Sequence, residues 1–289
     1  QEMEKKKEKL IRSKTWISKE RCRVFLSILE RLNKYFGEKW YVILLLTSCL
    51  GNYICGILIE KRKQKKYLIL GIVLNLAFLI YFKYTNFLID SFNNIFSCNI
   101  NTLKIILPLG ISFFTFQNIS YLVDVYKNDV KASRNFINYA CYITLFPQLI
   151  AGPIVRYKDI NEELEARKIN ISLFSKGIKR FTIGLGKKVL IADMLFKMYE
   201  TILKSNMSVL TYWLVAIFFT LQIYFDFSGY SDMAIGLGKM FGFHLKENFD
   251  YPLVSPSVTV FWRRWHMSLS NFFKDYVYIP LGGNRVSKL

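Results

Sequence analysis

"WYVILLLTSCLGNYICGILI", residues 40–59, carries no charged side chain and is followed directly by the basic run "EKRKQKK", residues 60–66. Twenty residues of α-helix rise about 30 Å, which is the thickness of the hydrocarbon core of a bilayer. Lysine and arginine concentrate in loops on the cytoplasmic side of a membrane. The stretch therefore predicts a transmembrane helix whose C-terminal end faces the cytoplasm.

Four further apolar stretches repeat this pattern along the chain. They are residues 67–82, 103–123, 136–155 and 209–225. We expect five strong spanning helices, with weaker candidates between and after them. Pro147, Gly152 and Pro153 interrupt the fourth stretch, and they favour a broken or re-entrant path that lines a cavity. The predicted fold class is all-α: a polytopic transmembrane helix bundle with broken or re-entrant helices and interfacial helices.

The composition favours a membrane protein over a soluble one. The 289 residues are 52% hydrophobic and 17% aromatic, yet their formal net charge is +19. A soluble domain of this length seldom combines so much aromatic mass with so large a charge of one sign. A membrane protein accounts for both features, because its spanning helices are apolar and the loops beside the membrane are basic. We expect membrane lipids rather than nucleic acid as partners, and a multi-pass location in the cytoplasmic (inner) cell membrane.

Residues 1–39 form a basic N-terminal arm, with 12 Lys and Arg against 6 acidic residues, and residues 40–289 form the membrane domain. Within the arm, "RVFLSILERLNKYF", residues 23–36, spaces its apolar side chains on one helical face. This pattern predicts an amphipathic helix on anionic lipid. A solvated basic arm is the alternative.

The distribution of cations predicts the orientation. Loops 60–66 and 124–135 are basic, whereas residues 90–102 contain no Lys or Arg. The two basic loops should be cytoplasmic, and Cys98 should face the other side. Residues 156–170 are also rich in charge, although alternation of basic cytoplasmic loops with outside loops would place them outside. One segment near them should therefore not cross the membrane as a single straight helix. Residues 173–196 combine apolar side chains at helical spacing with lysines, as an interfacial or tilted helix does.

The cysteines offer no chemistry by their spacing. The chain contains five of them, and none has the spacing of a metal or redox site. We interpret them as packed thiols and expect no metal site.

A polar constellation follows the fifth apolar stretch. Residues 221–243 carry Asp226, Ser228, Tyr230, Ser231 and Asp232 at the end of the predicted span. Polar groups in an apolar setting usually face a cavity or a partner. These residues either form the polar wall of a central chamber or mark a helix end at the membrane surface, with Gly229 as the break.

"SVTVFWRRWHMSLSNFFKDYVYIPLGGNR", residues 257–285, holds one of only two histidines in the chain. Ser255 and Pro256 suit the N-cap and first position of a helix. The apolar side chains that follow recur every three or four residues and predict one continuous face: Trp262, Trp265 or His266, Leu269, Phe273 and Tyr276. His266 is either a proton-transfer group or an interfacial packing residue. His244 follows a predicted helix end, where an imidazole is often structural.

Four stretches together resemble the membrane-bound O-acyltransferases, in particular their alginate O-acetyltransferase branch. They are "LPLGISFFTFQNISYLVDVY" (107–126), "LFPQLIAGPIVRY" (145–157), "DFSGYSDMAIGLGKMFGF" (226–243) and a long segment from "ENFDYP" to "YIPLGGNR" (247–285). They occur in the order found in the family. The branch that transfers D-alanine to teichoic acid shares the Arg-Trp-His segment, but its counterpart of "YIPLGGNR" looks different.

The resemblance implies a helix bundle around a tunnel through the membrane. An acetyl group would move from a cytoplasmic thioester to hydroxyls of an extracytoplasmic polysaccharide. No bound cofactor is implied, because the acyl thioester donor, acetyl-coenzyme A or an acyl carrier, is a substrate. An extracytoplasmic acetyltransferase partner protein or the polysaccharide itself would receive the group. D-alanyl transfer to teichoic acid, a transport protein and a non-catalytic membrane fragment are the alternatives.

The resemblance also assigns roles to residues. The position of His266 has a polar helper role in catalysis, and the principal histidine lies in a downstream Trp-His-Gly segment. These 289 residues contain no Trp-His-Gly, and a basic arm replaces the family's apolar N-terminal helix. We expect the chain to be truncated at its C-terminus and inactive alone. The substrate or tunnel-lining candidates are Asp226, Ser228, Tyr230, Asp232, Trp262, Arg263, Arg264 and Trp265. The two arginines would hold a donor phosphate or, alternatively, anchor to lipid headgroups.

Overall fold

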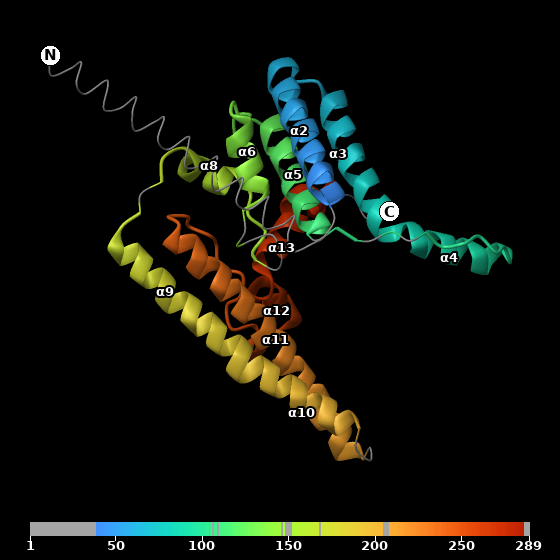
Figure 1. Cartoon of the computed structure of the whole chain (residues 1–289), viewed down its shortest axis with the longest axis vertical. Coiled ribbons are helices and arrows are strands. Elements are labelled where there is room, and N and C mark those ends of the chain that lie inside the picture. The colour runs from blue at the N-terminus through green and yellow to red at the C-terminus, as the bar shows by residue number, and fades with distance from the viewer. Residues whose placement is uncertain are drawn as a thin grey trace. The chain divides into compact units, whose positions relative to one another are not determined.

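The computed structural model describes residues 39–285, except 104, 106, 109, 146, 148–151, 168 and 205–207, and describes side chains from Ile43 onward. Every regular element in this part of the chain is a helix (Figure 1), which confirms the predicted all-α class. The chain forms two compact units, one up to Leu149 and one from Ile150 onward, and each is described by itself. The helix predicted within the basic arm lies outside the described residues. The single membrane domain 40–289 stays a prediction.

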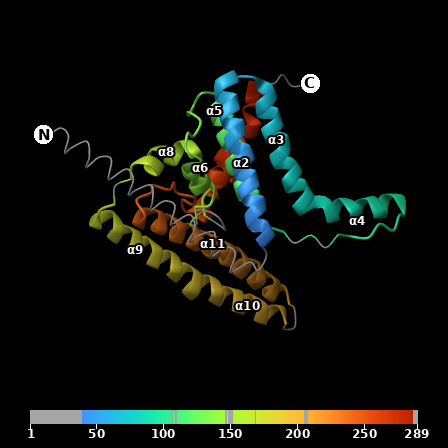
Figure 2. The ribbon, with the colours of Figure 1, turned by 45° about the horizontal axis from the view of Figure 1, so that its top comes forward.

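The first unit is a cluster of helices built on one antiparallel pair. Helix α2 (Lys39–Arg62) ends in the basic turn, and α3 (Lys65–Leu79) runs back beside it. Helix α5 (Ile111–Tyr126) packs against both, and α6 (Phe136–Ile143) completes the cluster (Figures 1 and 2).

Buried carboxamides join these helices at the centre of the unit. Asn75 Nδ2 donates to Asn52 Oδ1 at 2.6 Å, and Asn118 Nδ2 donates to Asn75 Oδ1 at 3.2 Å. The Tyr139 hydroxyl donates to Asn118 Oδ1 at 2.6 Å. An unpaired amide in apolar surroundings costs several kcal/mol, so each carboxamide favours the helix register that gives it a partner.

In the described residues, three helices are long and apolar enough to cross a membrane: Ile43–Arg62, Lys65–Phe96 and Val209–Met240. They contain three of the five predicted spans. The expectation of one uninterrupted spanning helix is wrong for stretch 103–123, where α5 has 16 residues, whereas stretch 136–155 is interrupted as predicted, since α6 has 8. Helix α5 begins only after Gly110, whose φ of 73° is left-handed. Helix α6 ends at Ile143, and residues 152–156, which include Pro153, are irregular.

The second candidate span bends sharply within its length. A π-helical turn, η1 (Ile80–Tyr84), separates α3 from α4 (Thr85–Phe96), and α4 turns away from α3 in Figure 2. The returning chain is held by two side-chain amides. Asn86 exchanges two hydrogen bonds with the backbone of Leu103, and Asn93 exchanges two with Ile100. Exposed Cys98 lies in this return.

The second unit contains one long helical pair and a series of short helices. The pair consists of a rod, formed by α9 (Ile171–Gly186), the π-helix η2 (Lys187–Ala192) and α10 (Asp193–Leu203), and of α11 (Val209–Met240). Figures 1 and 2 both show the rod lying along α11. The short helices are α8 (Tyr157–Glu165), η3 (Pro252–Val254), α12 (Val258–Arg264), α13 (Met267–Phe273), the π-helix η4 (Lys274–Tyr278) and η5 (Gly283–Arg285). The predicted interfacial or tilted segment 173–196 is thus part of a helix packed on α11.

Glycines allow α9 and α11 to meet backbone to backbone. A Cβ added to Gly184 would lie 2.6 Å from the carbonyl oxygen of Gly229, and one added to Gly177 would lie 2.7 Å from that of Gly236. The contacts are reciprocal, because a Cβ on Gly229 or Gly236 would lie 2.8 Å from the facing glycine oxygen. Small residues permit this approach in membrane helix pairs. A side chain at any of the four positions would push the helices apart.

Gly184→Ala should lower the thermal unfolding temperature of the detergent-solubilised protein. The added methyl group meets backbone atoms that cannot move without separating two helices, and such overpacking costs about 1–3 kcal/mol. Gly186→Ala is the matched control, since a Cβ there has no heavy atom within 4 Å and alanine favours helix. Equal unfolding temperatures for the two variants would contradict the close contact.

Candidate functional site around His266

Helix α12 begins two residues later than the sequence predicts. The Ser257 side chain accepts a hydrogen bond from Val260 N at 3.2 Å, so Ser257 is the N-cap. Ser255 instead ends the short helix η3, and its backbone N–H donates to Pro252 O at 3.1 Å. The predicted cap at Ser255 with Pro256 is therefore wrong, because the preceding turn already uses Ser255.

The helical pattern breaks at the histidine. Trp265 has extended backbone angles, and His266 has a left-handed φ of 45° as the residue before α13. The predicted continuous face from Trp262 to Tyr276 is wrong, since the chain changes direction between α12 and α13. The junction is held by the backbone of residues 244–250: Asp250 N donates to Arg264 O, and Met267 N donates to Asn248 O.

Aromatic rings surround the junction. The Phe227 ring of α11 meets the His266 imidazole edge-on, with 4.7 Å between ring centroids. Trp265 contacts Phe249 at 5.1 Å and stacks on Phe261 at 5.6 Å. Burial among these groups lowers the pKa of His266 to about 4. The imidazole is consequently neutral at physiological pH.

Polar contacts hold one side of the imidazole. His266 Nδ1 lies 3.0 Å from Asn248 Oδ1, and the Ser268 hydroxyl donates to the same oxygen at 2.8 Å. Ile154 N donates to that hydroxyl at 3.0 Å. Arg156 donates to Asp275 Oδ2 at 2.8 Å, which fixes the same irregular segment to η4. The predicted broken segment thus ends against the histidine junction.

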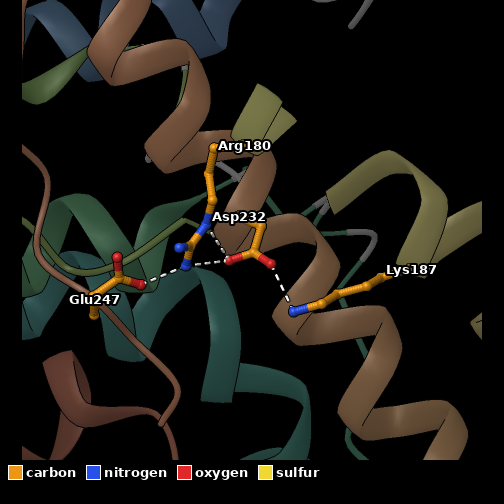
Figure 3. A network of polar contacts seen from close by, with 4 residues as sticks. All are labelled: Arg180, Lys187, Asp232 and Glu247. Atoms are coloured by element: carbon orange, nitrogen blue, oxygen red, sulfur yellow. Dashed lines mark hydrogen bonds and ion pairs between the residues drawn. The ribbon is translucent and has the colours of Figure 1, made fainter. Parts of the chain in front are cut away.

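Asp232 is the centre of a charged cluster between α9, η2 and α11 (Figure 3). Its side chain is only 7% exposed, and Arg180 and Lys187 both contact it, with Arg180 Nη2 at 2.6 Å and Lys187 Nζ at 2.7 Å. Arg180 also reaches Glu247 Oε2 at 2.5 Å. The cluster thereby connects the long helices to the segment that holds Asn248.

The other predicted residues on α11 face different surroundings. Asp226 pairs with Lys188 at 2.7 Å. Buried Ser228 has a hydroxyl with no hydrogen-bond partner among the described residues, and so has Ser231. Tyr230 is exposed. Helix α11 continues through Gly229, so the interpretation of that glycine as a helix break is wrong.

The remaining predicted residues lie on α12 or in the segment after α11. The Trp262 side chain is 55% exposed, Arg263 is exposed and Arg264 is partly buried. Neither arginine forms an ion pair within the described part of the chain, which is compatible with both anion binding and headgroup anchoring. His244 is exposed and bound by Glu163 of α8, with Nδ1 2.6 Å from Oε1.

The structure therefore divides the predicted site. It brings His266 against Phe227 and Trp265 against Phe249, and it places Asp226 and Asp232 in ion pairs with η2. Sequence reasoning missed Asn248 and Ser268. Asn248 lies 18 positions before His266, and the only signal for it was its place in the resembling segment 247–285. Within the described ranges, no three histidine, cysteine or acidic side chains gather as a metal would require.

Residues 44–289 match the model of the MBOAT, membrane-bound O-acyltransferase, family. The chain therefore belongs to this family, as the motifs predicted. The part described here is all helical and contains spanning-length helices, so the protein is a membrane protein.

Relatives with assigned names are similar over most of the chain. The probable alginate O-acetylase AlgI of Pseudomonas aeruginosa is 43% identical over 286 residues, 94% of this chain and 54% of that protein. The peptidoglycan O-acetyltransferase of Helicobacter pylori is 40% identical over 88% of this chain and 55% of its own length. The teichoic acid D-alanyltransferase of Bacillus subtilis is 31% identical over 59% of this chain and 45% of its length. The chain thus spans about half the length of the relatives it matches.

Asp232→Asn should destabilise the solubilised protein more than Glu247→Gln, because both carboxylates bind Arg180 but differ in burial. The Asp232 side chain is 7% exposed and that of Glu247 is 47% exposed. Loss of the buried charge removes the carboxylate partner of Lys187 and leaves Arg180 paired with Glu247 alone. It should cost about 1–3 kcal/mol, below the roughly 3–5 kcal/mol lost on breaking a fully buried pair. Glu247→Gln should cost less than about 1 kcal/mol. Thermal unfolding measures both, and the reverse order would contradict a structural role centred on Asp232.

Proposed function

We propose that the protein is an O-acetyltransferase of the membrane. It moves an acetyl group from a cytoplasmic thioester, acetyl-coenzyme A or an acyl carrier, to hydroxyls of an extracytoplasmic polysaccharide. The observation that carries this proposal is the 43% identity to an alginate O-acetylase over 94% of the chain. A partly buried, neutral imidazole at His266 supports it.

The class of acceptor follows from what the similar proteins share. One is named for alginate and another for peptidoglycan, at 43% and 40% identity. Both polymers present sugar hydroxyls, so the proposal specifies the chemistry of the acceptor and not the polymer. D-alanyl transfer to teichoic acid is a weaker candidate, because the similarity covers 59% of the chain at 31% identity.

The reaction requires an activated alcohol. The acceptor oxygen attacks the thioester carbonyl carbon, the carbon–sulfur bond breaks, and an ester and a thiol form. A base near the acceptor takes the hydroxyl proton, which finally reaches the leaving thiolate. A neutral imidazole is able to accept or relay this proton, whereas an imidazolium is not. His266 is neutral near pH 7 since burial holds its pKa at about 4.

Other predicted residues would surround the reacting groups. Trp262 and Trp265, at α12, would shape one part of the tunnel wall. Ser228 and Tyr230, on α11, would line another part. Arg263 or Arg264 would hold a phosphate of the donor through its fixed set of N–H donors. Asp226 and Asp232 would act indirectly, by fixing η2 against α11.

The location that fits this activity is the cytoplasmic or inner cell membrane, crossed several times by the chain. The donor would reach the protein from the cytoplasm. The acetyl group would then pass to the polysaccharide directly or through an extracytoplasmic acetyltransferase partner. Membrane lipids would cover the apolar helices.

His266→Ala should lower acetyl transfer by about 10²–10⁴-fold, because it removes a proton-transfer group without adding charge. The measurement is acceptor-dependent transfer of radiolabelled acetyl from acetyl-coenzyme A in membranes that contain the chain extended by the downstream Trp-His-Gly segment that the family resemblance implies, because the 289 residues are expected to be inactive alone. His244→Ala is the matched control and should retain activity, since His244 is exposed and bound by Glu163. Unchanged transfer by a correctly inserted His266→Ala variant would return His266 to a packing role. Labelling of the acceptor that does not depend on the thioester donor would contradict the proposed acetyltransferase function itself.

Cys98 should react with an impermeant thiol reagent in intact cells, because the basic turn 60–66 predicts a cytoplasmic end for α2 and an outside position for the return after α4. Cys98 is exposed, whereas Cys49 and Cys55 are buried. In a Cys98→Ser background, a cysteine at exposed Gln64 should react only after lysis. Labelling in the opposite order would invert the proposed orientation.

A further inference from the structure

Asn248 is fully buried beside the histidine junction. It lies in the irregular segment 244–250 and is 0% exposed. Its side-chain oxygen lies within hydrogen-bond distance of three groups: His266 Nδ1 at 3.0 Å, Ser268 Oγ at 2.8 Å and Ser268 N at 3.2 Å. Its backbone oxygen accepts from Met267 N at 2.9 Å. Asn248 thus contacts three consecutive residues at the start of α13: His266, Met267 and Ser268.

The contacts of Ser268 show which atom of the Asn248 carboxamide, oxygen or nitrogen, faces this junction. The backbone N–H of Ser268 can only donate, so the atom that it faces is the carboxamide oxygen and not the nitrogen. The Ser268 hydroxyl has one hydrogen, which it donates to the same oxygen, while it accepts from Ile154 N. Neither Asn248 Oδ1 nor Ser268 Oγ can therefore donate to His266 Nδ1.

The proton on the imidazole is then determined by elimination. Asn248 Oδ1 only accepts, so the 3.0 Å contact requires an N–H at His266 Nδ1. A neutral imidazole with its proton on Nδ1 keeps a lone pair on Nε2. Phe227 of α11, Asn248 and Ser268 contact the ring, and none of these three side chains is charged.

We propose that Asn248 is a positioning residue that fixes His266 in the Nδ1–H tautomer and leaves the lone pair on Nε2 free to accept or relay the acceptor hydroxyl's proton. The catalytic part of this inference rests on the proposed acetyltransferase function, and the tautomer part does not. An amide orients the ring without the added negative charge by which a carboxylate would stabilise the imidazolium. The ring therefore stays neutral and free to accept.

A cost in stability supports a functional reason for this asparagine. Asn248 Nδ2 is buried and has no hydrogen-bond partner among the described residues. A buried donor without a partner costs about 1–3 kcal/mol. An apolar residue would avoid that cost, but it could not accept from His266.

The test is ¹⁵N-histidine NMR of the solubilised protein at neutral pH, with the His266 signals assigned by their loss in His266→Gln. The parent protein should show a protonated Nδ1 and an unprotonated Nε2. A parent signal from the opposite tautomer would overturn the proposal without any variant. Because this readout needs no acetyl transfer, it stands apart from the proposed function.

Three variants complete the test. Asn248→Ala should give a mixture of tautomers and lower kcat for acetyl transfer by about 10²-fold or more, with a smaller change in KM. Asn248→Asp keeps an acceptor and should restore the Nδ1–H tautomer. Ser268→Ala is the matched control and should leave the tautomer unchanged, since the contact between Asn248 and His266 remains. An unchanged tautomer in folded Asn248→Ala, or a failure of Asn248→Asp to restore it, would overturn the proposal.

Discussion

The second unit depends on the contact between the backbones of α9 and α11 at two pairs of glycines. Because Gly184 and Gly229 lack side chains, η2 comes close enough for Lys187 to reach buried Asp232. Arg180, one turn before Gly184, reaches the same carboxylate. A buried carboxylate is tolerated only when cations and hydrogen bonds compensate it. The charged cluster is thus a consequence of the helix packing.

The same packing extends to the histidine. Arg180 binds Glu247, which directly precedes Asn248, and Asn248 contacts His266. Phe227, on α11, supplies the ring against which the imidazole lies. A displacement of α9 from α11 would accordingly reach His266 through covalent and polar links. Asp232, which the sequence suggested as a wall of the site, has this supporting position in the structure.

The sequence predicted the all-α class and the spans that contain 40–59, 67–82 and 209–225, because an uncharged run of that length has few alternatives. It did not predict the lengths of α5 and α6, since hydropathy does not report the left-handed turn at Gly110. His266 was identified from the sequence because it is one of two histidines and lies among the tryptophans and arginines of segment 257–285. Its contact with Asn248 was not predictable, because a left-handed residue at the α12–α13 break ends the periodicity from which helical faces are inferred. The α9–α11 glycines are plain in the sequence, but their pairing required the fold.

The π-helical turn η2 gives the long rod a place to absorb changes in chain length. A π-turn contains one residue more than the α-helical turn that it replaces. Loss of one residue from Lys187–Ala192 would let α9 and α10 join as a regular α-helix, and the side chains beyond would keep their directions around the axis, because the π-turn takes up the extra residue locally. Relatives that differ by a single residue here would therefore keep the same row of α10 side chains against α11. In such a helix, a length difference is absorbed within the helix rather than in a loop.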